Sequence, residues 1–381
     1  MKNKAILSIS HTSYINNVGG VEKVILEQSE VANKDGYTFI ALHPICISFK
    51  IKGHVICRSF NCYGIHIDKG EIIRFKPDEL LTVLMSYDIH KVYIHSLISY
   101  PIEQIVSLLK GFSNASIFFY VHDYKSICDG HNLLKNKIHY CGDNGLNFAK
   151  CFNCRFYLPG LISSRNYRHF ISSFPCMKFI FPSEIAKNIW KKTYNIIDED
   201  RLLVLPHQIF SISTMEYARN EKLKLAYIGY KSYNKGWSTF RNLVAYINNN
   251  EIDIELYVLG KTDEHLQNVT EVEVSFQKDG PNAMVKAIRN HKIDIAFLWS
   301  PWPETYSYTF FESYVGGSYI ITNKDSGNIA VCTNKYECGK VFDNETDLKF
   351  FFSDKKKLKF ITKSIVERPS ELLFNSDFIN L

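Results

Sequence analysis

The fold is decided by the stretch Pro301-Trp302-Pro303-Glu304-Thr305-Tyr306-Ser307-Tyr308-Thr309-Phe310-Phe311-Glu312, which follows the apolar run 293–299. The apolar run predicts a buried strand, and the small polar residues after it predict a loop that leads into a helix. The start of a helix presents free backbone N–H groups and favours an anion. Glu304 lies before this helix start and Glu312 lies on its first turns. The stretch therefore predicts an anion-binding turn flanked by two carboxylates.

The same alternation of apolar strands and helices extends through both halves of the chain. In the second half we expect strands at 223–229, 254–259, 272–276, 293–299, 319–322 and 339–342, with helices at 237–247, 281–289 and up to residue 315. In the first half we expect strands at 5–10, 37–43, 92–95, 117–121, 179–181 and 202–205, with helices at 21–33, 102–109 and 184–194. Continuous apolar strands that alternate with helices indicate parallel sheets covered on both faces.

We therefore expect an α/β protein of two Rossmann-like, doubly wound parallel-sheet domains that face each other across a cleft. The polar segment 206–221 has no clear periodicity and separates the two halves. The expected domains are residues 1–210, which include a cysteine-rich insertion at 124–160, and residues 211–350. Residues 351–381 are expected to form a closing helix and a tail. Ligands of such sheets bind beyond the carboxyl ends of the strands, so the cleft is the expected site.

Composition and charge narrow the functional class. A length of 381 residues suits two domains, and a net charge of +6 is too small and too dispersed to indicate nucleic-acid binding. This charge suits phosphate-bearing ligands or an anionic membrane surface. The sequence contains no apolar stretch of about 20 residues and no signal-peptide core at its start, so we expect no membrane-spanning helix. The expected location is the cytoplasm, with peripheral contact at the inner membrane face.

Three further groups are expected at strand ends that face the cleft. Gly19-Gly20 follows the first strand and opens a helix, which allows close approach to a phosphate or simply makes a tight turn. His122 ends the strand 117–121 and is expected to point into the cleft. Lys235 follows the strand 223–229 and is expected to reach a diphosphate, with Lys231 as the competing candidate.

These groups suit a sugar nucleotide, which has a diphosphate to be held and hydroxyls that donate to carboxylates. The fingerprint Gly-x-Gly-x-x-Gly is absent after the first strand, which argues against a dehydrogenase.

Four cysteines lie in the polar insertion: Cys128, Cys141, Cys151 and Cys154. The last two have the Cys-x2-Cys spacing of metal ligands. An insertion without its own hydrophobic core needs a cross-link, such as a bound metal ion, to be stable. The spacing predicts a structural Zn²⁺ ion, for which His131 and His139 are alternative ligands. The alternative is that these are unconnected thiols.

At this point the chain resembles the retaining glycosyltransferases of the GT-B fold, in the large family 4, from Gly19-Gly20 to about Phe342. The most specific match is residues 303–309 together with Glu312. Residues 223–236 look like the glycine-arginine…lysine-glycine segment of that family. His122-Asp123 followed by the four cysteines looks like a subgroup with a cysteine-bearing insertion.

The resemblance implies a role for each candidate residue. Glu304 would contact the hydroxyls of the donor sugar, Glu312 would hold the ribose, and His122 would lie near the reacting sugar. The backbone amides of residues 306–309 (Tyr306, Ser307, Tyr308 and Thr309), helped by Lys235, would hold the diphosphate. Gly19 and Gly20 would let the first loop approach the phosphates. Such enzymes need no catalytic metal, and their acceptor is expected to be a growing glycan, plausibly lipid-linked in polysaccharide biosynthesis.

One departure from the family pattern is Tyr230, which stands where the family has an arginine. Lys231 would then supply the missing charge. Two alternatives stay open: a sugar-nucleotide epimerase or phosphorylase on the same frame, and a non-catalytic protein that binds sugar nucleotides or glycans.

Overall fold

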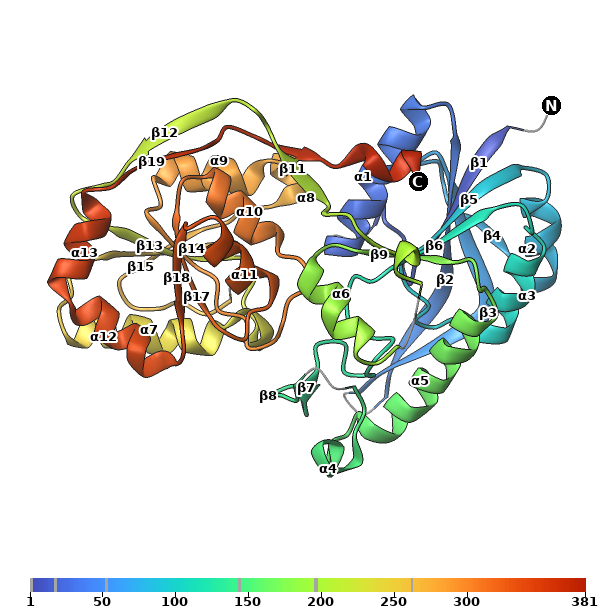
Figure 1. The fold of residues 1–381 in the computed structure, drawn as a ribbon, viewed down its shortest axis with the longest axis horizontal. Coiled ribbons are helices and arrows are strands. Elements are labelled where there is room, and N and C mark those ends of the chain that lie inside the picture. The colour runs from blue at the N-terminus through green and yellow to red at the C-terminus, as the bar shows by residue number, and fades with distance from the viewer. Residues whose placement is uncertain (1–2, 17–18, 52–53, 143–144, 195–197, 262) are drawn as a thin grey trace.

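The computed structural model describes residues 3–16, 19–51, 54–142, 145–194, 198–261 and 263–381, and it describes side chains outside residues 46–61 and Gln277. Two α/β units lie side by side, the first half of the chain on one side and most of the second half on the other (Figure 1). The expected architecture of two Rossmann-like sheets is confirmed.

The first unit is built on an eight-stranded sheet in the order β10-β9-β6-β5-β1-β2-β3-β4. Its strands are β1 (Lys4–Ile9), β2 (Thr38–Ile51), β3 (His54–Ile67), β4 (Ile73–Phe75), β5 (Asp88–Ile94), β6 (Ser116–Tyr120), β9 (Lys178–Phe181) and β10 (Leu202–Val204). The covering helices are α1 (Gly20–Lys34), α2 (Pro77–Leu84), α3 (Ile102–Lys110), α5 (Tyr157–Ser172) and α6 (Glu184–Lys191). Six of the strands run parallel, while β3 and β4 pair antiparallel at one edge.

The antiparallel edge was not expected, because the strand that begins near Tyr37 was predicted to end at His43. Instead β2 continues through Pro44, with a shift in register, and pairs with β3. Residues 44–67 alternate apolar and polar types, which is the pattern of an antiparallel strand pair rather than of a fully covered parallel strand.

The second unit is built on a six-stranded parallel sheet in the order β15-β14-β13-β16-β17-β18. Its strands are β13 (Lys224–Ile228), β14 (Glu255–Leu259), β15 (Val269–Val272), β16 (Ile295–Phe297), β17 (Tyr319–Asn323) and β18 (Gly339–Phe342). Its helices are α7 (Trp237–Asn249), α8 (Phe276–Asp279), α9 (Ala283–His291), α10 (Tyr308–Val315), α11 (Asn328–Lys335), α12 (Glu345–Ser353) and α13 (Lys355–Thr362). Separate apolar clusters cover the two faces of the sheet.

The chain crosses between the units twice. After β10 it forms β11 (Gln208–Phe210) and β12 (Thr214–Ala218), which pair with β20 (Leu372–Phe374) and β19 (Ile365–Pro369). Residues 351–381 thus contain the expected helix, as α13 (Lys355–Thr362), but the expected tail forms two strands, and the C-terminus lies beside α1 (Figure 1). A final 3-10 helix (Ser376–Asn380) buries Phe378 against Tyr93, with 5.8 Å between the ring centroids. The last residues therefore connect the two units.

The cysteine-rich insertion has little regular structure. It contains the short hairpin β7 (Leu134–Lys135) and β8 (His139–Tyr140) and the single-turn helix α4 (Phe148–Cys151). Across the described ranges, no helix has the length and apolar character that crossing a membrane requires.

Candidate active site

The loop between β16 and α10 holds Glu304 in a buried position with a cation. Its side chain is only 1% exposed, and Lys235 Nζ donates to both carboxylate oxygens, at 2.9 and 2.8 Å. The Ser300 hydroxyl also donates to Glu304 Oε1. Lys235 comes from the loop after β13, so two loops at the carboxyl end of the second sheet meet here, as the sequence predicted. A carboxylate held in this way is fixed in orientation and can accept hydrogen bonds from a ligand.

Gly236 brings Lys235 close to this loop. Its φ is +79°, and a Cβ atom at this position would lie 2.0 Å from the backbone oxygen of Trp299. Only glycine tolerates both the left-handed backbone and this approach. The glycine after Lys235 is therefore required by packing between the two loops.

The start of α10 is the second element of the site. Ser307 caps the helix, and its hydroxyl accepts from the backbone N–H of Phe310 at 3.4 Å. In the described ranges, the backbone N–H groups of Tyr308 and Thr309 donate no hydrogen bond. Free amides at a helix N-terminus attract an anion.

Glu312, one turn into α10, faces a lysine from the other unit. Lys23 Nζ of α1 lies 3.7 Å from Glu312 Oε1 and 4.4 Å from the centroid of the Tyr308 ring. Both charged side chains are buried. Burial raises the pKa of the Glu312 carboxyl, and the positive charge of Lys23 opposes this rise.

Sequence reasoning missed Lys23, although it lies three residues after Gly20 on the predicted helix. Gly20 itself faces the same ring, since a Cβ atom there would lie 3.7 Å from the Tyr308 ring. Gly19 is the N-cap of α1 and has an extended backbone. Gly20 therefore lies near the start of α10, and Gly19 precedes it in the chain.

A second carboxylate, Glu27, lies one turn beyond Lys23 on α1. Burial raises the pKa of Glu27 to about 7, with further increases from Glu30 and Glu312 and an opposing effect from Lys23. Among the described residues, no hydrogen bond reaches Glu27 Oε2. The buried Lys23 thus faces one buried carboxylate, Glu312, and one half-buried carboxylate, Glu27.

We expect that Glu27→Gln raises the stability of the protein, relative to the wild type, more at pH 8 than at pH 5. A carboxyl whose pKa is raised on folding stabilises the folded state below its unfolded pKa, and this contribution is lost as pH rises from about 4.5 towards 7. A shift from 4.5 to about 7 corresponds to at most about 3 kcal/mol. Thermal denaturation of the wild type and the variant at both pH values checks this. If the melting temperatures of the variant and the wild type differ by the same amount at pH 5 and at pH 8, the raised pKa of Glu27 is contradicted.

Three neighbouring imidazoles, of which His95 and His207 are buried and His122 is half-buried, extend from the first unit towards the second. His95 Nδ1 and His122 Nε2 share a hydrogen bond of 2.8 Å, and the His122 ring lies 5.4 Å from that of His207. The ring of His207 contacts those of Tyr306, at 4.7 Å, and Tyr308, at 5.9 Å. Sequence reasoning identified His122 and missed His207, which follows the carboxyl end of β10.

Burial keeps these imidazoles neutral. It lowers the pKa of His122 to about 4, although Asp123 has an opposing effect. It also lowers the pKa values of His95 and His207 well below the usual value. Asp123, the neighbour of His122 in the chain, has its Oδ2 3.2 Å from Nδ1 of His131. His95 is the residue that orients His122.

Backbone contacts bring His122 and Glu304 together across the units. Thr305, next to Glu304, donates from its hydroxyl to the backbone oxygen of His122 at 2.5 Å. The hydroxyl of Ser183 donates to the backbone oxygen of Thr305 at 2.7 Å. Residues far apart in sequence therefore form one site between the two sheets.

Lys231 lies elsewhere. Its Nζ lies 2.7 Å from Asp263 Oδ1 and 3.2 Å from Glu264 Oε2, and hydrogen bonds with these carboxylates raise its pKa. The neighbouring Tyr230 is 58% exposed. Of the two lysine candidates, Lys235 is the one that contacts Glu304.

The four cysteines of the insertion share one region as free thiols. Burial raises the pKa of Cys141 to about 11, and the charges of Cys128, Cys154 and Cys151 raise it further. Among the described residues, no three His, Cys, Asp or Glu side chains are arranged as metal ligands. The thiols are thus near enough to influence one another, but they are not arranged as a formed metal centre.

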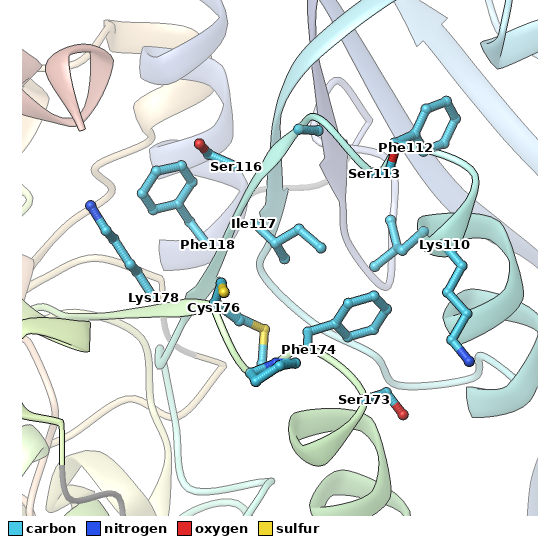
Figure 2. Close-up of a pocket in the computed structure, with 14 residues that line it drawn as sticks. Lys110, Phe112, Ser113, Ser116, Ile117, Phe118, Ser173, Phe174, Cys176 and Lys178 are labelled. Atoms are coloured by element: carbon cyan, nitrogen blue, oxygen red, sulfur yellow. The ribbon is translucent and has the colours of Figure 1, made fainter.

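Figure 2 shows a pocket of about 380 Å³ at the opposite end of the first sheet. Its lining includes Ser116 and Lys178, the first residues of β6 and β9, together with Phe174 and Cys176. Ligands of parallel sheets bind at the carboxyl ends of the strands, whereas this pocket lies at the amino ends. The pocket is therefore separate from the candidate active site.

A cavity of about 420 Å³ adjoins the site. It lies between α1 and the second unit, and its lining includes Lys23, Glu27, Gln208, Phe276 and Asn282. A ligand that contacts Glu312 can therefore extend past Lys23 into open space.

Comparison with solved structures shows the GT-B fold of glycosyltransferases over nearly the whole chain. WaaG, a glycosyltransferase involved in lipopolysaccharide biosynthesis, matches with a TM-score of 0.51 at 11% identity, over 94% of this chain and 93% of that chain. HepE of Anabaena in complex with UDP-glucose matches with a TM-score of 0.53 at 10% identity, over 94% and 91%. TarM matches with a TM-score of 0.59 at 9% identity, over 94% and 93%. No protein-family model matches the sequence, and no curated protein sequence matches it.

Proposed function

We propose that this protein is a glycosyltransferase that moves a sugar from a nucleotide diphosphate donor to a glycan or lipid-linked acceptor. The observation that carries this proposal is the Lys235–Glu304 pair beside the free amides of α10, with Thr305, the neighbour of Glu304, hydrogen-bonded to the backbone oxygen of His122. This arrangement provides an anion site, an acceptor for sugar hydroxyls and a neutral imidazole at one place. The GT-B fold and the UDP-glucose complex of HepE support the same class of donor.

In this proposal the donor diphosphate binds the backbone amides of residues 306–309 and Lys235. Glu304 accepts hydrogen bonds from the sugar, and Glu312 accepts them from the ribose. Because Lys23 lies 3.7 Å from Glu312, a bound ribose displaces Lys23 or shares the carboxylate with it. Gly19 and Gly20 leave room for the phosphates beside Tyr308. Lys231 assists only if it leaves Asp263 and Glu264.

We propose that transfer proceeds with retention at the anomeric carbon. The bond between the anomeric carbon and the phosphate oxygen breaks, and the acceptor oxygen forms the new bond on the same face. The acceptor proton passes to the leaving phosphate oxygen, whose charge Lys235 and the amides of α10 stabilise. His122, neutral at pH 7, positions the sugar or the acceptor without adding charge.

The proposal is tested by incubating the protein with a panel of UDP-, GDP-, ADP- and dTDP-sugars. Slow release of the nucleoside diphosphate together with free sugar supports the transferase. Formation of an isomeric sugar nucleotide would instead show an epimerase, and a requirement for inorganic phosphate a phosphorylase. Binding without any turnover, even with glycan acceptors, would show a non-catalytic binding protein.

His122→Ala is expected to lower kcat by about 10²-fold while changing donor affinity less than about threefold. The imidazole belongs to the first unit, whereas the nucleotide contacts are on the second, so the loss falls on turnover. Steady-state kinetics and isothermal titration with the donor separate the two quantities. His169→Ala, on exposed α5, serves as the matched control. A loss confined to donor affinity would contradict the role of His122.

We further propose that the cysteine insertion binds a structural zinc ion. The argument rests on the Cys-x2-Cys spacing and on the position of Cys141 directly after the β7–β8 hairpin, near the other thiols. Closing the site would draw the four sulfurs to about 2.3 Å from the metal. Four protein ligands leave no open position for substrate, so the ion would act only on structure.

Protein purified without metal-affinity steps is expected to contain about one zinc per chain by elemental analysis. Cys151→Ser should lose this zinc and lower the melting temperature of the first unit. Cys176→Ser, which alters an exposed cysteine outside the insertion, should keep it. Less than about half an equivalent of zinc in the wild type would remove the zinc proposal and leave the transferase proposal intact.

A further inference from the structure

The insertion ends in a surface that exposes large apolar side chains. Phe148 and Phe152 of the α4 region are 66% and 58% exposed. Leu158 and Ile162 of α5 are 71% and 67% exposed, and Leu161 is 45% exposed. We call these five residues the α4–α5 face. Burying apolar side chains of this size is worth more than 1 kcal/mol each, so such a cluster left open indicates a binding surface.

Ring contacts join the aromatic residues of the α4 region to the first turn of α5, which carries the apolar residues of the face. The rings of Phe148 and Phe152 lie 6.0 Å apart, and the ring of Phe148 lies 6.1 Å from that of Tyr157, the residue before Leu158. Leu158, Leu161 and Ile162 have the three- and four-residue spacing of one helix face. The opposite face of α5 packs Tyr167 and Phe170 into the core of the first unit. The apolar face of α5 therefore points away from the protein body.

The charge around this face has one sign. Residues 144–183 contain no Asp or Glu and five Lys or Arg, although the whole chain carries 39 acidic residues against 45 basic ones. Within the part of the chain that the structure describes, Lys150, Arg155 and Arg165 form no ion pair with a carboxylate. Asp129, whose backbone nitrogen lies near Gly160 of α5, is paired with Lys125, and His169, further along α5, lies 3.1 Å from Glu103 Oε1.

We propose that the α4–α5 face binds the surface of an anionic lipid bilayer. Apolar side chains interspersed with Lys and Arg, without acidic residues, are typical of segments that lie in the membrane interface. The absence of acidic residues from residues 144–183 makes the charge of this segment complementary to an anionic bilayer. α4 and the start of α5 also protrude at one end of the first unit, where a flat surface can reach them (Figure 1).

This surface adjoins the candidate active site. The hairpin β7–β8 is tied to the α4–α5 connection, because Asn136 Nδ2 donates to the backbone oxygen of Asn153 at 3.1 Å. The same hairpin reaches the second unit, where the Tyr233 hydroxyl donates to the backbone oxygen of Ile138 at 2.8 Å. A lipid-borne acceptor at the bilayer would therefore be presented near the cleft. Membrane binding itself does not depend on the proposed transferase activity.

The helix α13 is the competing surface, since it is rich in lysine and exposes Phe360 to 74%. Among the described residues no ring contact joins Phe360 to Phe350, the exposed aromatic residue of α12, so the aromatic residues there are separate. Phe360→Glu is thus a matched control, because it replaces an exposed apolar side chain on a basic helix with glutamate, as the variants of the α4–α5 face do.

The test is co-sedimentation with vesicles of phosphatidylcholine alone and with about one third phosphatidylglycerol. The wild type should bind the anionic vesicles at least tenfold more tightly than the neutral ones. Leu158→Glu/Ile162→Glu should weaken binding to anionic vesicles by tenfold or more. Arg155→Gln/Arg165→Gln should lower the affinity for anionic vesicles by about fivefold for each charge removed. Phe360→Glu should bind these vesicles as tightly as the wild type does. Because all these side chains lie at the surface, melting temperatures should stay unchanged.

Three outcomes would overturn the proposal. The wild type might sediment with neither vesicle, or Phe360→Glu might lose as much binding as the Leu158/Ile162 variant. Alternatively, gel filtration with light scattering might show a dimer that Leu158→Glu/Ile162→Glu dissociates, without lipid binding, which would assign the face to a second copy. Release of nucleoside diphosphate from a soluble donor is measured without vesicles, so failure here and failure of the transferase proposal are distinguished.

Discussion

Glu304→Gln is expected to lower kcat by about 10²-fold or more. The substitution keeps the size of the side chain but removes the charge that Lys235 and Ser300 hold at the site. An amide offers one acceptor oxygen where the carboxylate offers two, so it cannot bind Lys235 and a sugar hydroxyl equally well. The loss should be in turnover, because the sugar contact strengthens as charge develops at the anomeric carbon. Steady-state kinetics with the best donor of the panel measures it.

Two other glutamates make this prediction specific. Glu312→Gln should weaken donor binding by about 1–3 kcal/mol with a smaller effect on kcat, because this carboxylate is assigned to the ribose. Glu255→Gln should leave both quantities unchanged, since Glu255 begins β14 at the opposite end of the sheet and pairs with Lys224 at 3.8 Å. If Glu304→Gln retains wild-type kcat, the assignment of the reacting face is wrong.

Lys235→Met is expected to lower kcat/KM by about 10²–10³-fold and to destabilise the second unit. The substitution removes the cation proposed to contact the leaving phosphate and leaves the Glu304 carboxylate without its partner. Removing one member of a buried ion pair costs about 3–5 kcal/mol, and we expect about 2–3 here because the side chain of Lys235 is 28% exposed. Lys235→Arg should recover the stability but not the full rate, since guanidinium geometry differs from that of an ammonium.

The double variant Lys235→Met/Glu304→Gln separates the two effects. If the pair acts as a unit, its rate should be close to that of the worse single variant, and its melting temperature should exceed that of Lys235→Met. Thermal denaturation with and without UDP gives the melting temperature of each variant, and donor kinetics give its rate. Fully additive losses in rate and stability would show that the two residues act independently.

The sequence alone determined the alternation of parallel strands and helices in both units and the loops that carry the site. Continuous apolar runs such as 223–229 and 293–299 can be satisfied only inside a covered parallel sheet, and the polar residues that follow them must lie at its carboxyl edge. This reasoning located Glu304, Lys235, the start of α10 and His122 before any coordinates. These are local patterns, in which a residue and the element that positions it are neighbours in the chain.

Only the tertiary structure decided which residues meet. Lys23 reaches Glu312 from 289 positions away, and His122 takes its orientation from His95 rather than from the adjacent Asp123. Lys231 was the competing candidate to Lys235 in the sequence, but only Lys235 contacts Glu304. The C-terminal segment likewise pairs β20 with β11 and buries Phe378 in the first unit. Such contacts depend on how two separately folded sheets face each other, and the packing of one unit against the other leaves no periodic pattern in the sequence of either.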